Sequence, residues 1–378
     1  MSSPLDSHDL DAGAVLVGGF DGLALPARIA RDLGRGALGG VILFRRNLTD
    51  PFQARALCAS VAEVTRDALV CLDQEGGRVQ RLRAPFFELP PMRALGAVDD
   101  VSLTARAAEA LAEELRAVGV NLDLAPVCDV DSNPANPVIG DRAFGADPER
   151  VSRHAVAFLR GLQSRGVLAC AKHFPGHGDT DADSHHALPT LPHDRARLDR
   201  VELPPFVAAA RAGVAAVMTA HVRFDALDPA VPATLSPAVI DGLFKRELCA
   251  GITPPLVVSD DLLMRAVSDR WSVAASAVLS VSAGCDLLLV CSDPDAAVSA
   301  REALSAEARR SPSFAARLSD AALRVRAVRA RAPLAPDPDD LALAARFALP
   351  ARVALSGEIA TRCGTEAAPR FDPTERSP

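Results

Sequence analysis

The chain has 378 residues, of which 49% are hydrophobic, and its formal net charge is −7. A chain of this length and apolar content can bury a large core, and it fits one large α/β domain or two ordinary ones. The negative charge, without any basic block, argues against nucleic acid or an anionic membrane surface as a partner.

The N-terminal sequence predicts a cytoplasmic protein. Residues Met1 to Asp11 are polar and acidic, and the next apolar run, Ala14 to Val17, is far shorter than the core of a signal peptide. No run reaches the length of a membrane span. The eight cysteines form no CxxC pair and fall mainly in apolar segments, so we expect reduced, buried thiols.

Short apolar runs alternate with amphipathic, alanine-rich segments along the chain. Ser102 precedes an apolar stripe that ends at Gly119. Asp147 stands where it can cap a helix whose first residue is Pro148. Further helices are expected from Pro204, from Pro237, from Ser272, and over about Asp295–Arg309 and Ser313–Arg331. The strand candidates are Ala14–Val17, Gly40–Phe44, Ala68–Leu72, Val120–Leu124, Val167–Cys170, Ala215–Thr219, Leu256–Ser259 and Asp286–Val290.

These elements favour an α/β fold of the (β/α)8 barrel type, in a single domain, over an open doubly wound sheet. A doubly wound dinucleotide-binding sheet would carry a GxGxxG turn after an early strand, and residues Gly18 to Gly22 do not supply it. In a parallel barrel the carboxyl ends of the strands converge on one mouth. The polar residues that follow the predicted strands are Asp73, Asp129, Asp131, Lys172, His173, His221, Asp260, Asp261 and Asp293.

The composition changes near the C-terminus. We expect the barrel to occupy residues 1–331, because from Ala332 onward the chain is rich in proline, alanine, arginine and aspartate. Residues 332–378 then form a C-terminal extension whose role the sequence leaves open. Leu341–Phe347 is expected to form a packed turn or two, and Glu366–Pro378 is expected to be disordered.

The stretch from Ala171 to Pro189 is the densest in titratable groups, and we expect it to be a loop at the end of a strand. Its lysine is one of only two in the chain, which suggests a site that needs a compact ammonium group. The candidates in this stretch are Lys172, His173, His177, Asp179, Asp181, Asp183, His185 and His186.

Three further motifs carry candidate chemistry. Residues Leu72 to Arg81 run from a strand end into a glycine-rich turn with two acids and two arginines; these groups either grip a polyhydroxylated ligand or pair with each other. Residues Asn133 to Gly145 form a long loop that contains Arg142. This loop either contributes to the site or is a structural Ω-loop. Asp260 ends a fully apolar strand, where it can act as nucleophile or base, while Asp261 can cap the next helix.

Together these motifs resemble those of the family-3 glycoside hydrolases, and most closely the bacterial β-N-acetylglucosaminidases that act in cell-wall recycling. In chain order they read DQEGGRVQR, NPxNPVIGDRAFG, KHFPGHGDTxxDSHxxLP, MTAHV and SDDL, and the likeness covers roughly residues 10 to 310. The KHFPGHGDT…DSH motif is the most specific of them.

The resemblance implies a retaining exo-glycosidase that removes terminal β-linked N-acetylglucosamine without a metal or other cofactor. It assigns the nucleophile to Asp260, the general acid/base to His185 and the partner that orients this histidine to Asp183. The positions that it assigns to sugar binding are Asp73, Arg81, Arg142, Lys172 and His173. The expected partner is a small carbohydrate, an N-acetylglucosaminide or a muropeptide, with no nucleic acid and no membrane.

Other interpretations stay open at this point. A β-glucosidase of the same family would carry similar motifs, and phosphate could replace water in the second step. The histidines and acids of the predicted mouth could instead hold a metal ion, although most of them lie on one loop while metal ligands usually form a compact set. A sugar-binding barrel without activity would be expected to lack Asp260 or His185. The sequence does not determine the oligomeric state.

Overall fold

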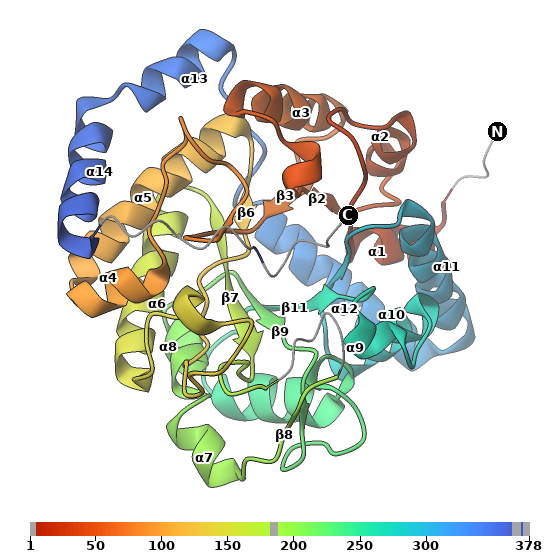
Figure 1. The fold of residues 1–378 in the computed structure, drawn as a ribbon. Helices are drawn as coiled ribbons and strands as arrows, with labels where there is room; N and C mark the ends of the chain where they lie inside the picture. The colour runs from red at the N-terminus through yellow and green to blue at the C-terminus, as the bar shows by residue number, and fades with distance from the viewer. Residues whose placement is uncertain (1–4, 182–187, 365–371, 373–378) are drawn as a thin grey trace.

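The computed structural model describes residues 5–181, 188–364 and 372. Within these residues, eight parallel strands pair into a closed barrel that helices surround (Figure 1). The order around the barrel is β1, β12, β11, β9, β7, β6, β3, β2, and β2 pairs with β1 to close it. This confirms the predicted (β/α)8 fold. The barrel strands are β1 (Leu16–Gly18), β2 (Gly40–Ile42), β3 (Leu69–Leu72), β6 (Leu122–Asp123), β7 (Leu168–Phe174), β9 (Ala216–Thr219), β11 (Leu256–Asp261) and β12 (Leu287–Val290).

The helices begin and end where the sequence supplies caps. The Asp147 carboxylate accepts the N–H groups of residues 149 and 150, as predicted for a helix that starts at Pro148. The helix expected from Ser102 begins instead at Val101, because Asp100 accepts the N–H of residues 102 and 103. The helices are α1 (Ser7–Ala14), α2 (Ala27–Gly34), α3 (Pro51–Val64), α4 (Met92–Val98), α5 (Val101–Val118), α6 (Pro148–Ser164), α7 (Arg195–Arg200), α8 (Pro204–Arg211), α9 (Arg265–Ser268), α10 (Val273–Ala283), α11 (Pro294–Arg310), α12 (Pro312–Arg329), α13 (Asp340–Phe347) and α14 (Pro350–Cys363).

The loops between the barrel elements contain shorter strands and helical turns. An antiparallel hairpin, β4 (Gln74–Gly76) and β5 (Val79–Gln80), follows β3 directly. A short parallel pair joins β8 (Thr190–Leu191) to β10 (Arg223–Phe224), so the loops after β7 and β9 are tied together. The remaining helical segments are η1 (Arg45–Asn47), η2 (Gly140–Arg142), η3 (Ala233–Leu235) and the wider, π-type η4 (Ala238–Leu248).

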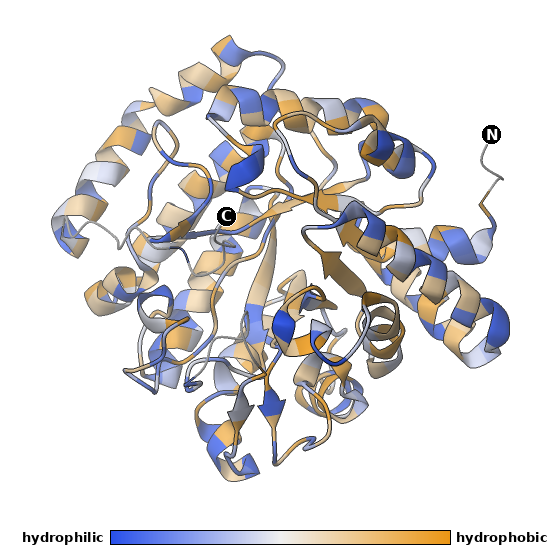
Figure 2. Cartoon of the chain, turned by 45° about the vertical axis from the view of Figure 1, so that its right-hand side comes forward, coloured by the Kyte–Doolittle hydropathy of each residue, from blue (hydrophilic) through white to orange (hydrophobic). Residues whose placement is uncertain are grey.

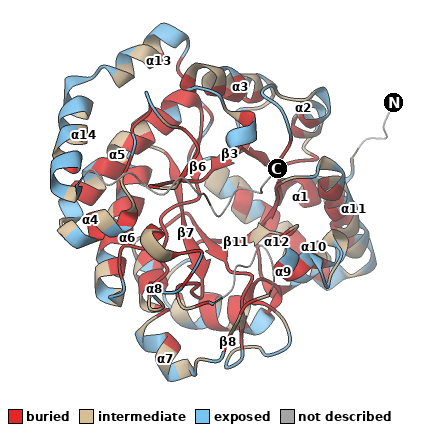
Figure 3. Ribbon diagram, viewed as in Figure 1, coloured by how far each residue is buried: buried red, intermediate tan, exposed pale blue. Residues whose placement is uncertain are grey.

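The core has two layers, one inside the barrel and one between barrel and helices. Along β7, Leu168 and Cys170 join apolar residues of the other strands in the barrel interior, whereas Ala169 and Ala171 pack with helix residues. The strands and the inner faces of the helices are apolar and buried (Figures 2 and 3). Because successive side chains of a strand point to opposite faces, the next inward position of β7 is residue 172.

The C-terminal helices pack on the outside of the barrel. α13 contacts α5, and α14 contacts both α4 and α5 (Figure 1). Arg106 of α5 binds Glu358 of α14 with two hydrogen bonds, at 2.8 and 2.7 Å. The packed turn expected at Leu341–Phe347 is α13, whereas α14 was not predicted. Of the segment expected to be disordered, Glu366–Pro378, the structure describes residue 372.

Two expectations about composition are also tested. Seven of the eight cysteines are buried and all eight are free thiols, with Cys363 partly exposed. Burial raises the pKa of the Cys58 thiol to about 12, which makes it chemically inert. In the part of the chain that the structure describes, every helix is too short or too polar to span a membrane.

Candidate active site

Three of the predicted sugar-binding side chains meet in an ion-paired cluster at the barrel mouth. Asp73 comes directly after β3, and its Oδ1 accepts a hydrogen bond from the Lys172 ammonium at 2.6 Å. Its Oδ2 accepts one from Nη2 of Arg81 at 2.9 Å. Burial alone would raise the pKa of Asp73, but the charges of Lys172 and Arg81 outweigh burial and hold it well below its usual value. The carboxylate is therefore ionised.

Glu75 links this cluster to Arg142. Its Oε1 lies 2.5 Å from Nζ of Lys172, and the Arg142 guanidinium donates to both of its oxygens at 2.9 and 2.8 Å. The side chains of Glu75 and Arg142 are each 1% exposed. Burial opposes ionisation, yet Arg142 and Lys172 lower the pKa of Glu75 to about 2. We call Asp73, Glu75, Arg81, Arg142 and Lys172 the mouth network.

The β4–β5 hairpin holds Arg81 in place. Its turn contains Gly76 and Gly77 at φ 110° and 58°, a left-handed conformation that favours glycine. The side-chain oxygen of Gln74 accepts the N–H of Arg81 at 2.8 Å, so the end of the hairpin is fixed to its start. The guanidinium is thereby directed back toward Asp73, eight residues earlier.

The loop after β6 holds Arg142. The side chain of Asn136 accepts the N–H groups of Val138 and Ile139, both at 2.8 Å. The carbonyl oxygen of Val138 in turn accepts a hydrogen bond from Arg142 at 3.2 Å. Arg78 of the hairpin donates to the same carbonyl at 2.8 Å. Loop and hairpin are thus joined, and both arginines are positioned by backbone groups.

Asp129 orients His173, the remaining predicted sugar-binding residue. The Nδ1 of His173 lies 2.7 Å from one oxygen of Asp129, whose other oxygen accepts the N–H of His177 at 2.7 Å. Asp129 is fully buried. Burial raises its pKa, but the charge of His173 and the hydrogen bond to it outweigh burial, so the pKa is below its usual value. Burial, reinforced by His173, lowers the pKa of His177 to about 4. His177 is therefore neutral at pH 7.

The expectation that the chain from Ala171 onward forms a loop is wrong for its first four residues. β7 continues to Phe174, because the N–H of Lys172 donates to Pro126 at 3.1 Å and its carbonyl accepts from Cys128 at 2.6 Å. The loop that follows packs tightly, since a Cβ on Gly178 would lie 1.8 Å from the carbonyl oxygen of Val130.

Asp179 anchors this loop. Its carboxylate lies 2.5 Å from Nε2 of His193 and accepts a hydrogen bond from Ser132 at 3.1 Å. Asp183 and His185, the predicted acid/base pair, lie outside the described residues, as does His186.

Asp260 lies within β11, which extends two residues beyond its predicted end at Ser259. It lies at the carboxyl end of β11, which belongs to the barrel mouth, and the residue is half-buried. Asp261 does not cap the following helix. Its carboxylate accepts the N–H groups of Leu263 at 3.1 Å and Cys291 at 3.0 Å, which ties β11 to the loop after β12.

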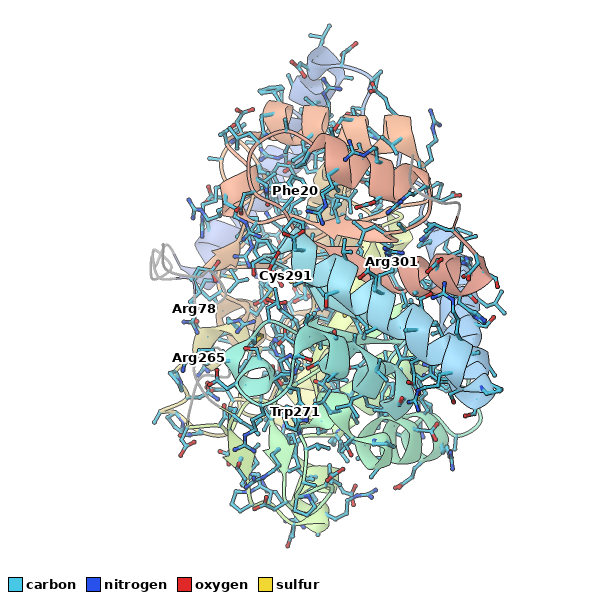
Figure 4. All side chains as sticks on the ribbon, turned by 90° about the vertical axis from the view of Figure 1, so that its right-hand side faces the viewer. Phe20, Arg78, Arg265, Trp271, Cys291 and Arg301 are labelled. Atoms are coloured by element: carbon cyan, nitrogen blue, oxygen red, sulfur yellow. The ribbon has the colours of Figure 1, made fainter. Side chains whose placement is uncertain are left out.

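The strand order places Asp73 and Asp260 on opposite walls. Four steps around the closed barrel separate β3 from β11, which is half of the circuit, and β7 with Lys172 stands midway between them. In Figure 4, Arg78 and Arg265, which follow β3 and β11 in the chain, lie on the same side of the molecule, at the carboxyl ends of the strands. The candidate nucleophile and the mouth network therefore stand on opposite sides of the barrel mouth.

The profile of the Glycosyl hydrolase family 3 N terminal domain matches residues 16–328. The chain belongs to glycosyl hydrolase family 3. Its family-3 relatives include the Beta-hexosaminidase of Nitrosomonas eutropha, 40% identical over 267 residues, which are 69% of this chain and 75% of the relative. The Beta-hexosaminidase of Methylococcus capsulatus is 42% identical over 274 residues, or 71% of this chain and 80% of that protein.

Solved family-3 structures have the same fold. A β-N-acetylglucosaminidase from Paenibacillus sp. str. FPU-7 matches with a TM-score of 0.85 and 40% identity, over 95% of this chain and 69% of the other. NagZ from Neisseria gonorrhoeae, in complex with N-trifluoroacetyl-D-glucosamine, matches with a TM-score of 0.76 and 30% identity, over 93% and 98%. The protein is a glycoside hydrolase.

The residues suggested for a metal site are engaged differently. His221 lies 2.8 Å from the Thr234 hydroxyl and 3.0 Å from the carbonyl of Asp261, and His173 binds Asp129. Among the residues that the structure describes, there is no group of three or more His, Cys, Asp or Glu side chains that could hold a metal ion. Asp183 and His185 of that proposed set lie outside those residues.

Sequence reasoning missed two members of the site, Glu75 and Asp129, as functional residues. Glu75 follows Asp73 by two positions, and this spacing in an extended segment could have indicated that both carboxylates face the same way. Asp129 was recognised as a residue at a strand end, and β6 is the barrel neighbour of β7, which carries His173. Neighbouring strands bring such residues within contact.

Proposed function

We propose that this family-3 hydrolase removes a terminal β-linked N-acetylglucosamine residue with retention of configuration. The observation that carries the proposal is the position of Asp260 across the barrel from the mouth network. The names of the two curated relatives above, both Beta-hexosaminidase, and the N-acylated glucosamine bound to the Neisseria gonorrhoeae structure support the choice of sugar.

Asp260 is the proposed nucleophile. Its carboxylate attacks the anomeric carbon while the glycosidic oxygen departs, and a glycosyl-aspartate ester forms. Water then attacks the same carbon, the ester bond breaks, and the Asp260 carboxylate is regenerated. Two inversions give net retention.

His185 is the proposed acid and base, with Asp183 as its partner. In the first step the protonated imidazole gives its proton to the departing oxygen; in the second step the neutral imidazole takes one from the attacking water. Retaining glycosidases usually use a second carboxylate for this role. An imidazole with an ordinary pKa near 6.5 exchanges protons readily at neutral pH, and an acid on its other nitrogen fixes the tautomer.

The mouth network and His173 are proposed to bind the sugar. A neutral sugar needs donors and acceptors, and charged groups form the stronger hydrogen bonds with hydroxyls. Lys172 has three N–H groups, and in the described part of the chain two of them point at Asp73 and Glu75. The third is suited to a sugar hydroxyl. Ionised carboxylates accept from hydroxyls, and guanidinium groups donate to them.

The biological setting is also a proposal. A terminal N-acetylglucosaminide from a muropeptide fits the expected substrate class, and we place the reaction in peptidoglycan recycling in the cytoplasm. We assign catalysis to residues 1–331 and treat residues 332–378 as an extension. The reaction consumes water and uses no cofactor.

The test is hydrolysis of chromogenic β-glycosides of N-acetylglucosamine and of glucose, with and without a chelator. We expect preference for N-acetylglucosamine, no effect of the chelator, and a loss of about ten-thousandfold in Asp260→Ala. His185→Ala should lose roughly 10²–10⁴-fold. Asp269→Ala, an exposed acid in the segment after β11, is the matched control. Equal hydrolysis by parent and Asp260→Ala would refute the mechanism, and loss of activity with the chelator would favour a metal-dependent reaction.

A further inference from the structure

An arginine of the C-terminal extension holds the chain that follows the β4–β5 hairpin. We call residues 81–91, which connect β5 to α4, the connecting segment. Arg352 of α14 donates from Nη2 to the carbonyl oxygen of Pro85 and from Nε to the carboxylate of Glu114 in α5. The other oxygen of Glu114 accepts the N–H of Phe87 at 2.5 Å. Arg352 therefore binds the connecting segment both directly and through α5.

The connecting segment in turn holds the hairpin. The side-chain nitrogen of Gln80, the last residue of β5, donates to the carbonyl oxygen of Phe87 at 3.0 Å. The side-chain oxygen of Gln80 accepts the N–H of Leu89 at 3.2 Å. The carbonyl oxygen of Leu89 accepts the N–H of Gly77, in the turn of the hairpin, at 2.9 Å. The strand β5 and the turn are thus both fixed to the residues that Arg352 holds.

The charge of Arg352 matters because Glu114 is buried. The side chain of Glu114 is 3% exposed, and that of Arg352 is 17% exposed. Burial raises the pKa of Glu114, and the N–H of Phe87 and the charge of Arg352 only partly offset this rise. Without Arg352 the carboxyl group would be protonated more readily, and a neutral carboxyl group accepts a weaker hydrogen bond than a carboxylate. Loss of Arg352 therefore weakens both of its routes to the connecting segment.

We propose that Arg352 is a positioning residue of the sugar site, so that the C-terminal extension fixes the hairpin at the barrel mouth. The hairpin carries Glu75, whose carboxylate lies 2.5 Å from Nζ of Lys172. The inference rests on the proposed function, in which Lys172 donates to a sugar hydroxyl. A looser hairpin should weaken sugar binding more than the attack by Asp260, because β11 lies half of the barrel circuit away from β3.

The experiment compares Arg352→Ala and Arg352→Lys with the parent on a chromogenic N-acetyl-β-glucosaminide. We expect Arg352→Ala to raise KM by roughly two- to thirtyfold, with kcat within about threefold of the parent. Arg352→Lys keeps the charge but not the fork, so its KM should lie in between. Arg362→Ala is the matched control. Arg362 also joins α14 to α5, through Asp100 at 2.8 Å, and the control should keep the KM of the parent.

Two measurements separate positioning from stability. Arg352→Ala should also unfold at a lower temperature, since Glu114 loses its cation, and so the kinetics are measured where circular dichroism shows every variant folded. Ethylguanidinium can replace the missing group because the site is partly exposed, and it should lower the KM of Arg352→Ala without affecting the parent or the control. Glu114→Gln should also raise KM, and in the double variant the two effects should not multiply.

Three results would overturn the inference. The first is a parental KM in folded Arg352→Ala, which would leave Arg352 a purely structural role. The second is a fall in kcat at unchanged KM. The third is a full product of the two effects in the double variant, which would exclude the route through Glu114. If Arg352→Ala does not fold, Arg352→Lys and Glu114→Gln decide in the same way. Failure of the proposed function would look different, because the parent itself would not hydrolyse the N-acetylglucosaminide.

Discussion

Glu75→Gln should be the most damaging isosteric change in the site. The substitution keeps the shape but removes the charge that Lys172 and Arg142 share, and it turns an amide NH2 toward their N–H groups. Two hydrogen bonds of 2.8 and 2.9 Å to Arg142 and an ion pair of 2.5 Å to Lys172 are affected, between side chains no more than 2% exposed. Removal of one partner of a buried ion pair costs about 3–5 kcal/mol.

The lowered pKa of Glu75 agrees with this direction. A fall from its usual value of 4.5 to about 2 corresponds to roughly 3 kcal/mol of stabilisation of the ionised form. Because the folded-state pKa is the lower one, this stabilisation is complete above pH 4.5 and is lost as the pH falls toward 2. The difference in stability between parent and variant should therefore be about 3–5 kcal/mol at pH 7 and shrink below pH 4.5.

Urea unfolding at several pH values measures this difference, and the kcat/KM for an N-acetylglucosaminide should fall in parallel, because Arg142 and Lys172 lose their shared anchor. Glu358→Gln is the control. Glu358 also binds an arginine through two hydrogen bonds, but it is 34% exposed, so its loss should cost less than about 1 kcal/mol. An equal, small effect of both substitutions would refute the argument from burial and charge.

Two further predictions concern the loop after β7. Since burial lowers the pKa of His177 from 6.5 to about 4, stability should fall by on the order of 3 kcal/mol as the pH drops through this window, and His177→Gln should lack this dependence; parallel curves would contradict it. Gly178→Ala should destabilise by about 1–3 kcal/mol, because its Cβ would meet the Val130 carbonyl oxygen. Gly357→Ala, which meets no atom within 4 Å in α14, should be neutral or stabilising.

The fold was readable from the sequence because local signals agreed with one another. Apolar runs marked all eight barrel strands, and Asp147-Pro148 marked a helix start to the residue. Errors arose where the signal was not local. β7 and β11 run past the point at which their sequences become charged, because neighbouring strands and loops supply partners for their backbone and side chains. α14 has a proline start but a weak apolar stripe, and long-range ion pairs hold it to α5.

The site was partly readable for a different reason. Residue types and spacing pointed to Asp73, Lys172 and Asp260 as members of the mouth, and the structure brings the first two into contact. Sequence patterns do not show which acidic side chain pairs with which basic one. The hydrogen bonds of Glu75 with Arg142, 67 residues away, were therefore not predicted. The hydrogen bond from Arg81 to Asp372 is the extreme case, since 291 residues separate the two positions and no motif marks the second.

The division of labour among the carboxylates follows from the barrel itself. Asp73 and Glu75 each contact two cations, which lower the pKa values of both carboxylates. Because their charge is shared with these cations, the two carboxylates are weak nucleophiles and are better suited to binding a ligand. Asp260 lies at the carboxyl end of β11, half of the circuit away from β3. A sugar held by hydroxyls against the first wall presents its other face to the second. In the proposed mechanism, the positions of the two strands in the barrel thus separate the acids that bind the substrate from the acid that attacks it.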